Sequence, residues 1–364
     1  MYSVANVLPM NILLLTRYDR LGASSRYRFY QFLPFLEKKA LSFKVSFLLS
    51  DSYLQNLYQR NRLNSFLTVL FAYVKRSLVL LSSRRFDLVW IEKELFPWLP
   101  AFLELPLLRL GPPYIVDYDD AIFHNYDQHR SSIIRKIFGN KIEKVMRGAA
   151  AVVSGNRYIA DYAREAGVRL VEIIPTVLDI GKYKEVQRKR NNRFTIGWIG
   201  SPSTSRHLRV AGSALKEVCM NGELQLVTVG AHPIDLSNLL ASAIPWSEET
   251  ETEDLRSFNV GIMPLPNTAW ERGKCGFKLI QYMACGLPVV ASPVGVNKEI
   301  VDHGVNGFLA DGAKQWIEYL KVLKENPKLC RKMGKAGRKK VEEEYSFQVA
   351  APKLLNLLRE AAEV

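Results

Sequence analysis

Two short, largely apolar runs, each followed by a loop of small residues and then a helical pattern, constrain this chain most strongly. The first covers residues 11–16 (NILLLT) and the second residues 194–199 (FTIGWI). Such runs are typical of strands buried on both faces of a parallel sheet. The loops after them, residues 22–25 (GASS) and 200–206 (GSPSTSR), allow a ligand to approach the backbone. The sequence therefore predicts an α/β fold with two cycles of parallel strands.

The length of the chain predicts more than one domain. Its 364 residues suggest two domains of ordinary size, each able to bury its own core. The stretch 182–193 (KYKEVQRKRNNR) is polar and charged, as interdomain linkers are. We therefore expect one Rossmann-like domain at residues 1–187 and a second at residues 188–346, with ligands at the C-terminal ends of their strands.

The composition excludes several classes of protein. Its 48% hydrophobic and 24% charged residues are those of a soluble globular protein, not of a disordered chain. The four cysteines form no C-x-x-C pair, which argues against a zinc site or a disulfide framework and fits a reducing, cytoplasmic location. The first residues show no signal-peptide pattern. The cysteines are Cys219, Cys275, Cys285 and Cys330.

Positive charge is concentrated in the first third of the chain. The formal net charge is +14, and residues 1–112 hold 15 Lys and Arg against 7 Asp and Glu, an excess of 15 − 7 = +8. Nucleic acid, an anionic bilayer and a phosphorylated substrate are all partners that such a charge favours. No nucleic-acid-binding module is recognisable, and the basic residues do not interleave with aromatic ones, so we expect no nucleic-acid partner.

Two apolar stretches in the same region leave two interpretations open. Residues 53–81 and 95–111 are rich in Leu and Phe, but Lys75 in the first and three prolines in the second exclude transmembrane helices. The stretches either form the core of the first domain or lie in a membrane interface, with Trp98 as an anchor. In the second case the protein works peripherally, on the inner face of the cell membrane. The charges expected to meet lipid head groups are Arg60, Arg62, Lys75 and Arg76.

The segment 270–297 (WERGKCGFKLIQYMACGLPVVASPVGVN) predicts a loop, a helix and a strand. Gly273 and Gly276 permit a tight turn, and the helix after them is closed by a Gly and a Pro. A glycine-rich loop at a helix N-terminus offers backbone N–H groups and a positive dipole end to a diphosphate. Lys274 and Lys278 add two charges there. The alternative is a helix that only packs on the sheet, with two solvated lysines at its edge.

The run GFKLIQYMACGLPVVAS in that segment resembles the donor-binding segment of glycosyltransferase family 4 enzymes, which have the GT-B fold. In that family a Glu, seven residues and a second Glu lead into a similar A-C-G-x-P-V-V-A-S run. Here Gly273 and Gln281 take those two places, so both carboxylates are lost and Glu271 is the only acid nearby. Residues 171–179 (VEIIPTVLD) and 299–309 (EIVDHGVNGFL) also resemble passages of the family.

The resemblance is strongest over residues 194–344 and implies a GT-B fold: an α/β protein of two Rossmann-like domains facing a cleft. A C-terminal helix at residues 347–364 would cross back and pack on the first domain. The family implies a retaining, metal-independent hexosyltransferase that needs no cofactor and takes a UDP- or GDP-linked sugar. A glycan or lipid-linked acceptor in bacterial cell-surface polysaccharide or glycolipid synthesis fits such an enzyme. The alternatives are a non-catalytic GT-B protein that binds a nucleotide sugar, which the missing carboxylates favour, and a nucleotide-sugar epimerase.

Two further departures from the family lie at strand ends. Residues 117–119 form the D-x-D string that binds manganese in GT-A transferases, but the GT-B resemblance argues against a metal site. Asp119 and Asp120, directly after a strand predicted at residues 114–118, stand where the family has a His-Asp pair. Ser201 replaces a donor-binding Arg, which leaves Arg206 or His207 as the nearest cation. Ser203 and Thr204 are either phosphate ligands or helix N-caps.

The resemblance assigns three groups of site residues. The expected catalytic residues are Asp119, Asp120 and Lys278. The expected donor-binding residues are Gly22, Ala23, Ser201, Ser203, Thr204, Arg206, Glu271, Gly273, Lys274, Gly276, Phe277, Lys278, Leu279 and Gln281. The expected acceptor-binding residues are Ser24, Ser25 and Arg26. Gln281 is expected to bind the ribose, and Gln281→Glu to be tolerated, because it restores the carboxylate of the family.

Overall fold

The computed structural model describes residues 9–58, 65–183, 193–231 and 241–363, which form two compact units. Unit 1 comprises Met1–Thr176, Gly273–Cys275 and Ala350–Val364. Unit 2 comprises Val177–Arg272 and Gly276–Val349. The domain boundary predicted at residue 187 lies outside the described residues.

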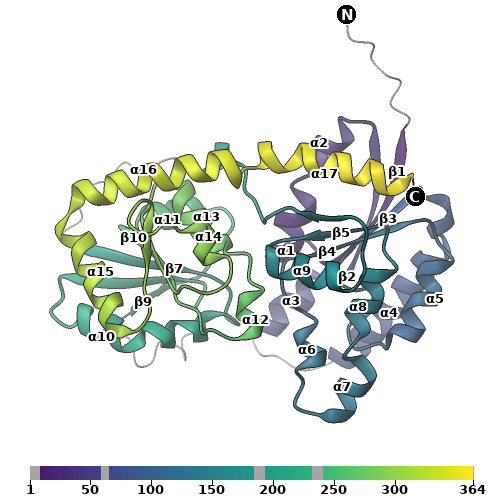
Figure 1. The fold of residues 1–364 in the computed structure, drawn as a ribbon, viewed down its shortest axis with the longest axis horizontal. Helices are drawn as coiled ribbons and strands as arrows, with labels where there is room; N and C mark the ends of the chain where they lie inside the picture. The colour runs from purple at the N-terminus through teal and green to yellow at the C-terminus, as the bar shows by residue number, and fades with distance from the viewer. Residues whose placement is uncertain (1–8, 59–64, 184–192, 232–240, 364) are drawn as a thin grey trace, which may run out of the picture. The chain divides into compact units, whose positions relative to one another are not determined.

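Unit 1 is built on a six-stranded sheet whose paired strands are all parallel, in the order β2-β1-β3-β4-β5-β6 (Figure 1). The chain enters at β1 and adds β2 on one side and β3 on the other, so the strand order reverses between β1 and β3. Such a switch point is where open α/β sheets bind ligands. The strands are β1 (Met10–Tyr18), β2 (Leu41–Leu49), β3 (Leu88–Glu92), β4 (Tyr114–Tyr118), β5 (Ala151–Ser154) and β6 (Val171–Ile173).

The helices of unit 1 follow its strands in sequence. They are α1 (Ala23–Ser25), the π-helical turn η1 (Arg26–Tyr30), α2 (Leu33–Glu37), α3 (Asp51–Tyr58), α4 (Ser65–Leu81), the 3₁₀ turn η2 (Ser83–Arg85), α5 (Ala101–Arg109), α6 (His124–Asp127), α7 (Ser132–Phe138), α8 (Lys141–Arg147) and α9 (Arg157–Glu165). The helical pattern expected after the loop at residues 22–25 is divided into η1 and α2. Pro34, which has no N–H to donate, stands in the first turn of α2, where a proline is tolerated.

Helix α4 holds an arginine that the sequence placed at the surface and the structure places in the interior. Arg76, predicted to meet lipid head groups, is 1% exposed and donates to the backbone oxygens of Thr16 (2.6 Å) and Ser46 (3.0 Å). Its charge therefore serves the interior of unit 1. Lys75 is exposed, while the other two arginines of the predicted group, Arg60 and Arg62, lie outside the described residues. Within the described residues, no helix combines the length and apolar character needed to cross a bilayer.

Unit 2 repeats the arrangement with a second parallel six-stranded sheet, in the order β12-β11-β10-β7-β8-β9. Its order reverses between β7 and β10. The strands are β7 (Phe194–Ile199), β8 (Leu224–Val229), β9 (Ala241–Ile244), β10 (Val260–Met263), β11 (Val289–Ala291) and β12 (Gly307–Leu309). The sequence did not predict β9, because this strand is four residues long and none of its residues is fully buried.

The helical segments of unit 2 are the 3₁₀ turns η3 (Ile180–Lys182) and η4 (Ser205–Ala211), and helices α10 (Gly212–Cys219), α11 (Glu251–Arg256), α12 (Ala269–Arg272), α13 (Phe277–Ala284), α14 (Asn297–Ile300), α15 (Ala313–Glu325) and α16 (Pro327–Glu344). Helix α17 (Phe347–Ala362) begins in unit 2 and ends in unit 1. The helix predicted at residues 347–364 corresponds to α17.

Tyr282 ties α13 to the two central strands of unit 2. Its ring packs over Gly261 of β10, where a Cβ would lie 2.2 Å from the ring. Its hydroxyl accepts a hydrogen bond from Ile199 N (2.9 Å), at the end of β7, and donates to Ile262 O of β10 (3.3 Å). A side chain on Gly261 would displace the ring, so this strand glycine is needed for close packing. Helix α13 is therefore held at the switch point of the sheet.

We predict that Tyr282→Phe lowers the free energy of unfolding by about 1–3 kcal/mol, because it leaves the buried amide of Ile199 without its acceptor. Urea unfolding measures the change. Tyr319→Phe is the matched control, because Tyr319 is only partly buried and its ring, stacked on Phe308 at 4.5 Å, is unchanged. Equal losses in the two variants would contradict the role of the Tyr282 hydroxyl.

Candidate functional site

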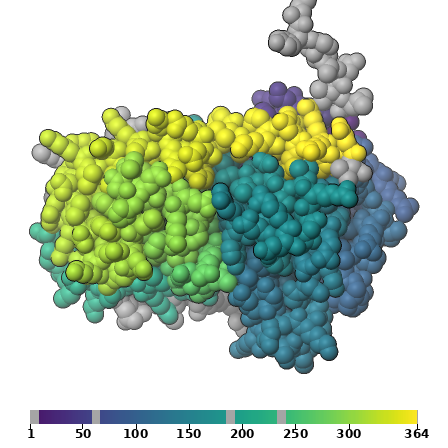
Figure 2. All heavy atoms as spheres, viewed as in Figure 1, coloured from purple at the N-terminus to yellow at the C-terminus, as the bar shows by residue number. Residues whose placement is uncertain are grey.

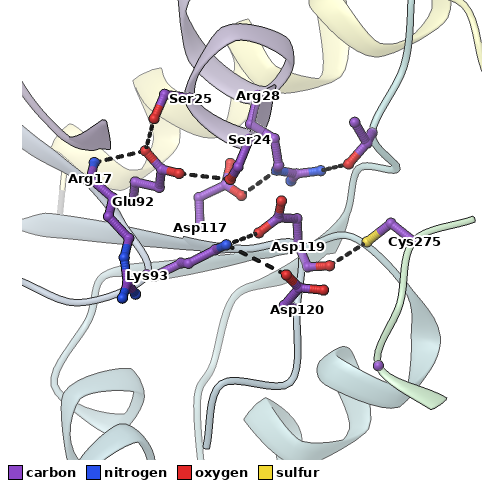
Figure 3. Close-up of polar contacts among 12 residues, drawn as sticks. Arg17, Ser24, Ser25, Arg28, Glu92, Lys93, Asp117, Asp119, Asp120 and Cys275 are labelled. Atoms are coloured by element: carbon purple, nitrogen blue, oxygen red, sulfur yellow. Dashed lines mark hydrogen bonds and ion pairs between the residues drawn. The ribbon is translucent and has the colours of Figure 1, made fainter. Parts of the chain in front are cut away.

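A buried carboxylate, Glu92, lies at the switch point of the unit 1 sheet. It is 1% exposed and accepts hydrogen bonds from the hydroxyls of Ser24 and Ser25 (both 2.6 Å) and from Arg17 N (2.8 Å) (Figure 3). The serines come from α1 and the arginine from β1, so Glu92 fixes the loop after β1 to the end of β3. Ser24 and Ser25 were predicted to bind an acceptor. In this structure Ser25 is fully buried and both hydroxyls hold Glu92.

An ion pair between Arg28 and Asp117 lies beside Glu92. Arg28 Nε is 2.5 Å from Asp117 Oδ1, and its Nη1 donates to Ile174 O (2.9 Å) and Thr176 Oγ1 (3.3 Å). Burial opposes the charge, but Asp117 raises the pKa of Arg28 above its ordinary value, so the guanidinium stays cationic. Arg28 reaches this position from the π-helical turn η1, and π-helical turns are frequent at functional sites.

Lys93 holds the two aspartates that were predicted to be catalytic. Its Nζ lies 2.8 Å from Asp119 Oδ1 and 3.6 Å from Asp120 Oδ2 (Figure 3). Burial alone would raise the pKa of Asp119, but Lys93 and Arg28 lower it to about 2, so the carboxylate is ionised. Lys93 has a φ of 63°, a strained value for a non-glycine residue. Sequence reasoning missed Lys93, because no local pattern marks a lysine directly after a strand as a partner of residues far along the chain.

The D-x-D string at residues 117–119 is occupied by cations of the protein itself. Asp117 pairs with Arg28 and Asp119 with Lys93, so both carboxylates are already neutralised. In the part of the chain that the structure describes, no group of three or more His, Cys, Asp or Glu side chains could hold a metal ion.

The segment Gly273–Cys275 clusters with unit 1, although the residues on both sides of it belong to unit 2. Lys274 Nζ lies 2.9 Å from Asp120 Oδ1, and Cys275 Sγ donates to Asp119 O at 2.9 Å. Lys274, predicted to bind a diphosphate, is thus paired with a predicted catalytic carboxylate. The ammonium group of Lys274 therefore already has an anionic partner within the protein.

Gly273 shows why the first carboxylate of the family is missing. A Cβ at this position would lie 2.3 Å from Ala121 Cβ and 2.8 Å from Ala121 N. The backbone oxygen of Gly273 also accepts a hydrogen bond from Asn156 Nδ2 (2.9 Å), which fixes the segment. Glutamate therefore does not fit here unless the segment moves away from Ala121 and Asn156.

A second polar cluster lies at the switch point of the unit 2 sheet, around Lys278 in the first turn of α13. Lys278 Nζ is 3.5 Å from Thr204 Oγ1 and 5.2 Å from the ring centroid of Trp198. Its side chain crosses Gly200, where a Cβ would lie 2.6 Å from Lys278 Cε. Gly276, with a φ of 66°, turns the chain into the helix. One ammonium group and the start of a helix therefore meet at the loop after β7.

Hydroxyl groups line that loop. Ser201 Oγ lies 2.9 Å from Ser203 Oγ, and Thr204 Oγ1 donates to Ser201 O (3.0 Å). In the structure neither Ser203 nor Thr204 caps a helix with its side chain: η4 begins after Thr204 without a side-chain cap bond. The alternative interpretation of these hydroxyls as N-caps is therefore wrong for η4. Hydroxyls beside an ammonium group suit phosphate oxygens.

Several other predicted donor residues have different surroundings. Glu271 is 5% exposed and lies 3.3 Å from His207 Nε2, so its carboxylate is directed at a histidine. Arg206 is exposed. Leu279, another predicted donor residue, is fully buried in the hydrophobic core, and its N–H donates to Gly276 O (2.9 Å). Phe277 also packs against that core, and is partly buried.

The three predicted residues around α1 belong to unit 1. Gly22 precedes α1, and a Cβ on it would lie 2.5 Å from Tyr18 Cβ, so a larger residue does not fit. Ala23 begins the helix. Arg26 is 9% exposed, and its Nη1 donates to Arg20 O (3.1 Å), which braces the loop after β1.

Gln281 is part of a buried network that sequence analysis did not foresee. Its Nε2 donates to Glu251 Oε1 (2.8 Å), which also accepts from the Tyr183 hydroxyl (2.9 Å). Trp246 Nε1 donates to Glu251 Oε2 (2.8 Å). Glu251 stands in the acidic run at residues 248–254, a pattern that is typical of a solvated helix start, but its side chain is only 5% exposed. A second carboxylate at position 281 would face Glu251, which argues against the expectation that Gln281→Glu is tolerated.

We predict that Gln281→Glu destabilises unit 2 by about 1–3 kcal/mol at neutral pH, because it replaces a buried donor by a like charge. The double variant Glu251→Gln, Gln281→Glu restores one donor and one acceptor and should recover most of the loss. Thermal unfolding of the single and double variants measures both effects. If the single variant is as stable as the parent, the network does not constrain position 281.

We predict that Gly273→Ala displaces the segment Gly273–Cys275, because the new methyl group overlaps Ala121. Cys275 is 7% exposed and should become reactive towards a thiol reagent, while the other three cysteines stay buried. Gly181→Ala is the control, because a Cβ there meets only Asp179 Oδ1 at 3.4 Å. Unchanged thiol reactivity in Gly273→Ala would show that the segment tolerates a side chain.

Comparison with known proteins finds a family match within the C-terminal part of the chain. Residues 262–340, which include α13 and β11, match the family model of glycosyl transferases group 1. Sucrose synthase 1 of Tulipa gesneriana is 30% identical over 88 residues, which are 22% of this chain and 11% of that protein. The chain thus matches only a small part of the length of this curated relative.

Solved structures resemble the chain along nearly its whole length. HepE of Anabaena, in complex with UDP and glucose, has a TM-score of 0.73 at 16% identity and is matched over 96% of this chain and 99% of its own. Sucrose-phosphate synthase of Thermosynechococcus elongatus has a TM-score of 0.74 at 14% identity, over 97% and 99% of the two chains. The predicted resemblance to GT-B glycosyltransferases is confirmed, and the fold is α/β of the GT-B type.

Proposed function

We propose that this chain, whose residues 262–340 match the family model of glycosyl transferases group 1, transfers a sugar from a nucleotide-sugar donor to an acceptor. The donor diphosphate would bind in unit 2, at the switch point of its sheet. The retaining outcome, the UDP- or GDP-linked donor and the absence of a metal or cofactor requirement are parts of the same proposal.

The position of Lys278 is the observation that carries this proposal. Its ammonium group lies beside the Thr204 hydroxyl, over a glycine at the end of β7 and in the first turn of α13. Negative charge develops on the diphosphate as the glycosidic bond breaks, and a fixed cation with helix N–H groups stabilises it in the transition state. HepE, of the same fold, binds UDP, which supports a nucleotide diphosphate as the ligand.

For the acceptor we propose a glycan or a lipid-linked molecule, bound by unit 1, in bacterial cell-surface polysaccharide or glycolipid synthesis. The charge excess of residues 1–112 supports an anionic molecule or an anionic membrane surface as the partner. In unit 1 the ionised Asp119 and its neighbour Asp120 are the carboxylates proposed to act in transfer.

A second candidate function is a GT-B protein that binds a nucleotide sugar without transferring it. The arrangement of Asp119 and Asp120 favours it, because Lys93 and Lys274 already neutralise these carboxylates. Gly273 and Gln281 also stand where the resembled family carries glutamates. Assays of sugar transfer and of nucleotide-sugar hydrolysis separate the two functions, since only the transferase consumes the donor.

Thermal-shift screening against UDP, GDP, ADP and their sugars tests the first step of both functions. A ligand present at 100 times its dissociation constant, and bound only to the folded chain, adds about 2.7 kcal/mol of stability. A stabilising nucleotide then serves as the donor in a transfer assay. If none of these nucleotides stabilises the chain, the proposed donor site is wrong.

We predict that Lys278→Ala weakens binding of the nucleoside diphosphate by about 1.5–3 kcal/mol, roughly 10- to 150-fold, and leaves binding of the nucleoside unchanged. Lys274→Ala should have a smaller effect, because Asp120 already holds that ammonium group. Lys298→Ala, at an exposed lysine of α14, is the control for loss of charge. Calorimetry measures the affinities, and equal losses for nucleoside and diphosphate would rule out the phosphate role of Lys278.

A further inference from the structure

Helix α4 carries its apolar side chains outward and its buried charge inward. Seven residues form what we call the α4 outer face, with exposed fractions from 49% to 75%: Phe66, Leu67, Leu70, Phe71, Val74, Leu78 and Leu81. On the opposite side, Arg76 is 1% exposed and Leu80 5%. A helix on a water-facing surface normally has the reverse arrangement. Something less polar than water therefore suits the α4 outer face.

The apolar surface continues onto the neighbouring elements. Helix α4 packs beside α5, which exposes Phe102 (69%) and Leu103 (49%). Tyr73 of α4 has its ring 5.1 Å from that of Phe96, two residues before Trp98, which is 51% exposed. The Trp98 ring in turn lies 6.1 Å from that of Phe138, at the end of α7. These contacts place α4 next to α5 and to the Trp98 segment, and the Trp98 segment next to α7.

The charges on these elements are of one sign. Residues 65–85 and 129–138 contain no Asp or Glu, and the one acid of α5, Glu104, is fully buried and pairs with Lys141 (3.1 Å). The α6–α7 segment projects from the rest of unit 1, as Figure 2 shows. The exposed basic residues are Lys75, Arg84, Arg85, Arg109, Arg130, Arg135 and Lys136.

We propose that the α4 outer face, with Trp98 and the exposed residues of α5 and α7, docks into the interface of an anionic lipid bilayer. The apolar side chains enter the boundary between head groups and acyl chains, and the basic residues meet anionic head groups. Tryptophan suits this depth, because its ring is apolar and its N–H is polar. The charge complementarity distinguishes a bilayer from a second copy of this chain, whose same face would bring basic residues together. The inference rests on the proposed function only in placing the acceptor at that bilayer.

Vesicle flotation of the full chain tests this proposal. The protein should float with vesicles of phosphatidylcholine and phosphatidylglycerol, and less with phosphatidylcholine alone. Phe71→Ser with Leu78→Ser should weaken partitioning at least about tenfold, because two inserted side chains become polar. Both positions are exposed, so the fold should persist, as circular dichroism will check. The matched control is Met220→Ser with Val305→Ser, which removes two exposed apolar residues of unit 2 and should bind vesicles like the parent.

Insertion itself is measured with an environment-sensitive dye. All four native cysteines are buried, so Phe71→Cys can be labelled selectively. Its fluorescence should shift to the blue with anionic vesicles and be quenched by brominated acyl chains, whereas dye at Met220→Cys should not respond. Equal flotation of Phe71→Ser/Leu78→Ser and the parent overturns the proposal. So does a parent that ignores vesicles and forms a dimer, detected by sedimentation, that the same double variant dissociates.

The nucleotide-binding measurement keeps this proposal separate from the proposed function. Phe71→Ser with Leu78→Ser should bind the stabilising nucleotide as the parent does. Both positions lie on α4 of unit 1, whereas α13 and β7 belong to unit 2. Loss of vesicle binding with nucleotide binding intact supports docking. Vesicle binding without any nucleotide binding would leave docking supported and the transferase proposal contradicted.

Discussion

The hydroxyl of Tyr282 joins the two central strands of unit 2, and the position of the proposed anion site depends on it. Tyr282 lies one helical turn after Lys278, so the contacts that fix its ring also fix the direction of the lysine. Those contacts need a glycine at position 261, since a side chain there would meet the ring. A glycine in a strand, a tyrosine in a helix and two backbone groups at strand ends together determine where the ammonium group lies.

Unit 1 depends on a different constraint, the pairing of buried charges. Burying a charged side chain is costly unless a partner compensates it, and each acid at the ends of β3 and β4 has such a partner. Arg28 compensates Asp117, Lys93 compensates Asp119, and serine hydroxyls with one amide surround Glu92. Removing one partner leaves a buried charge without compensation, so each of these residues depends on its partner for stability. Lys93 and Lys274 already contact these carboxylates, so a ligand that binds Asp119 or Asp120 also meets a lysine.

The sequence predicted the strands and long helices well, because their signals are local. The apolar runs at 11–16, 114–118 and 194–199 correspond to buried strands, and the loop-helix-strand pattern after Gly276 agrees with α13 and β11. The family resemblance also predicted the GT-B fold from a local signal, the contiguous run GFKLIQYMACGLPVVAS.

The contacts of the sites could not be predicted in this way, because they join residues far apart in the chain. Glu251 appeared solvated in an acidic run, yet it is buried against Gln281, thirty positions later. Arg76 looked like a surface charge, but it donates to carbonyls of two strands that precede it by 30 and 60 positions. The sequence showed only that Gly273 stands where the resembled family has a glutamate. The structure gives a reason, because Ala121 leaves no room for a side chain there.

A crystal structure of the chain with the nucleoside diphosphate that stabilises it most tests the central claim directly. The account predicts diphosphate oxygens within hydrogen-bonding distance of Lys278 Nζ and the Thr204 hydroxyl, at the C-terminal ends of β7 and β10. A diphosphate bound elsewhere, with the ammonium group of Lys278 still beside Thr204 and no phosphate oxygen near it, would contradict the account.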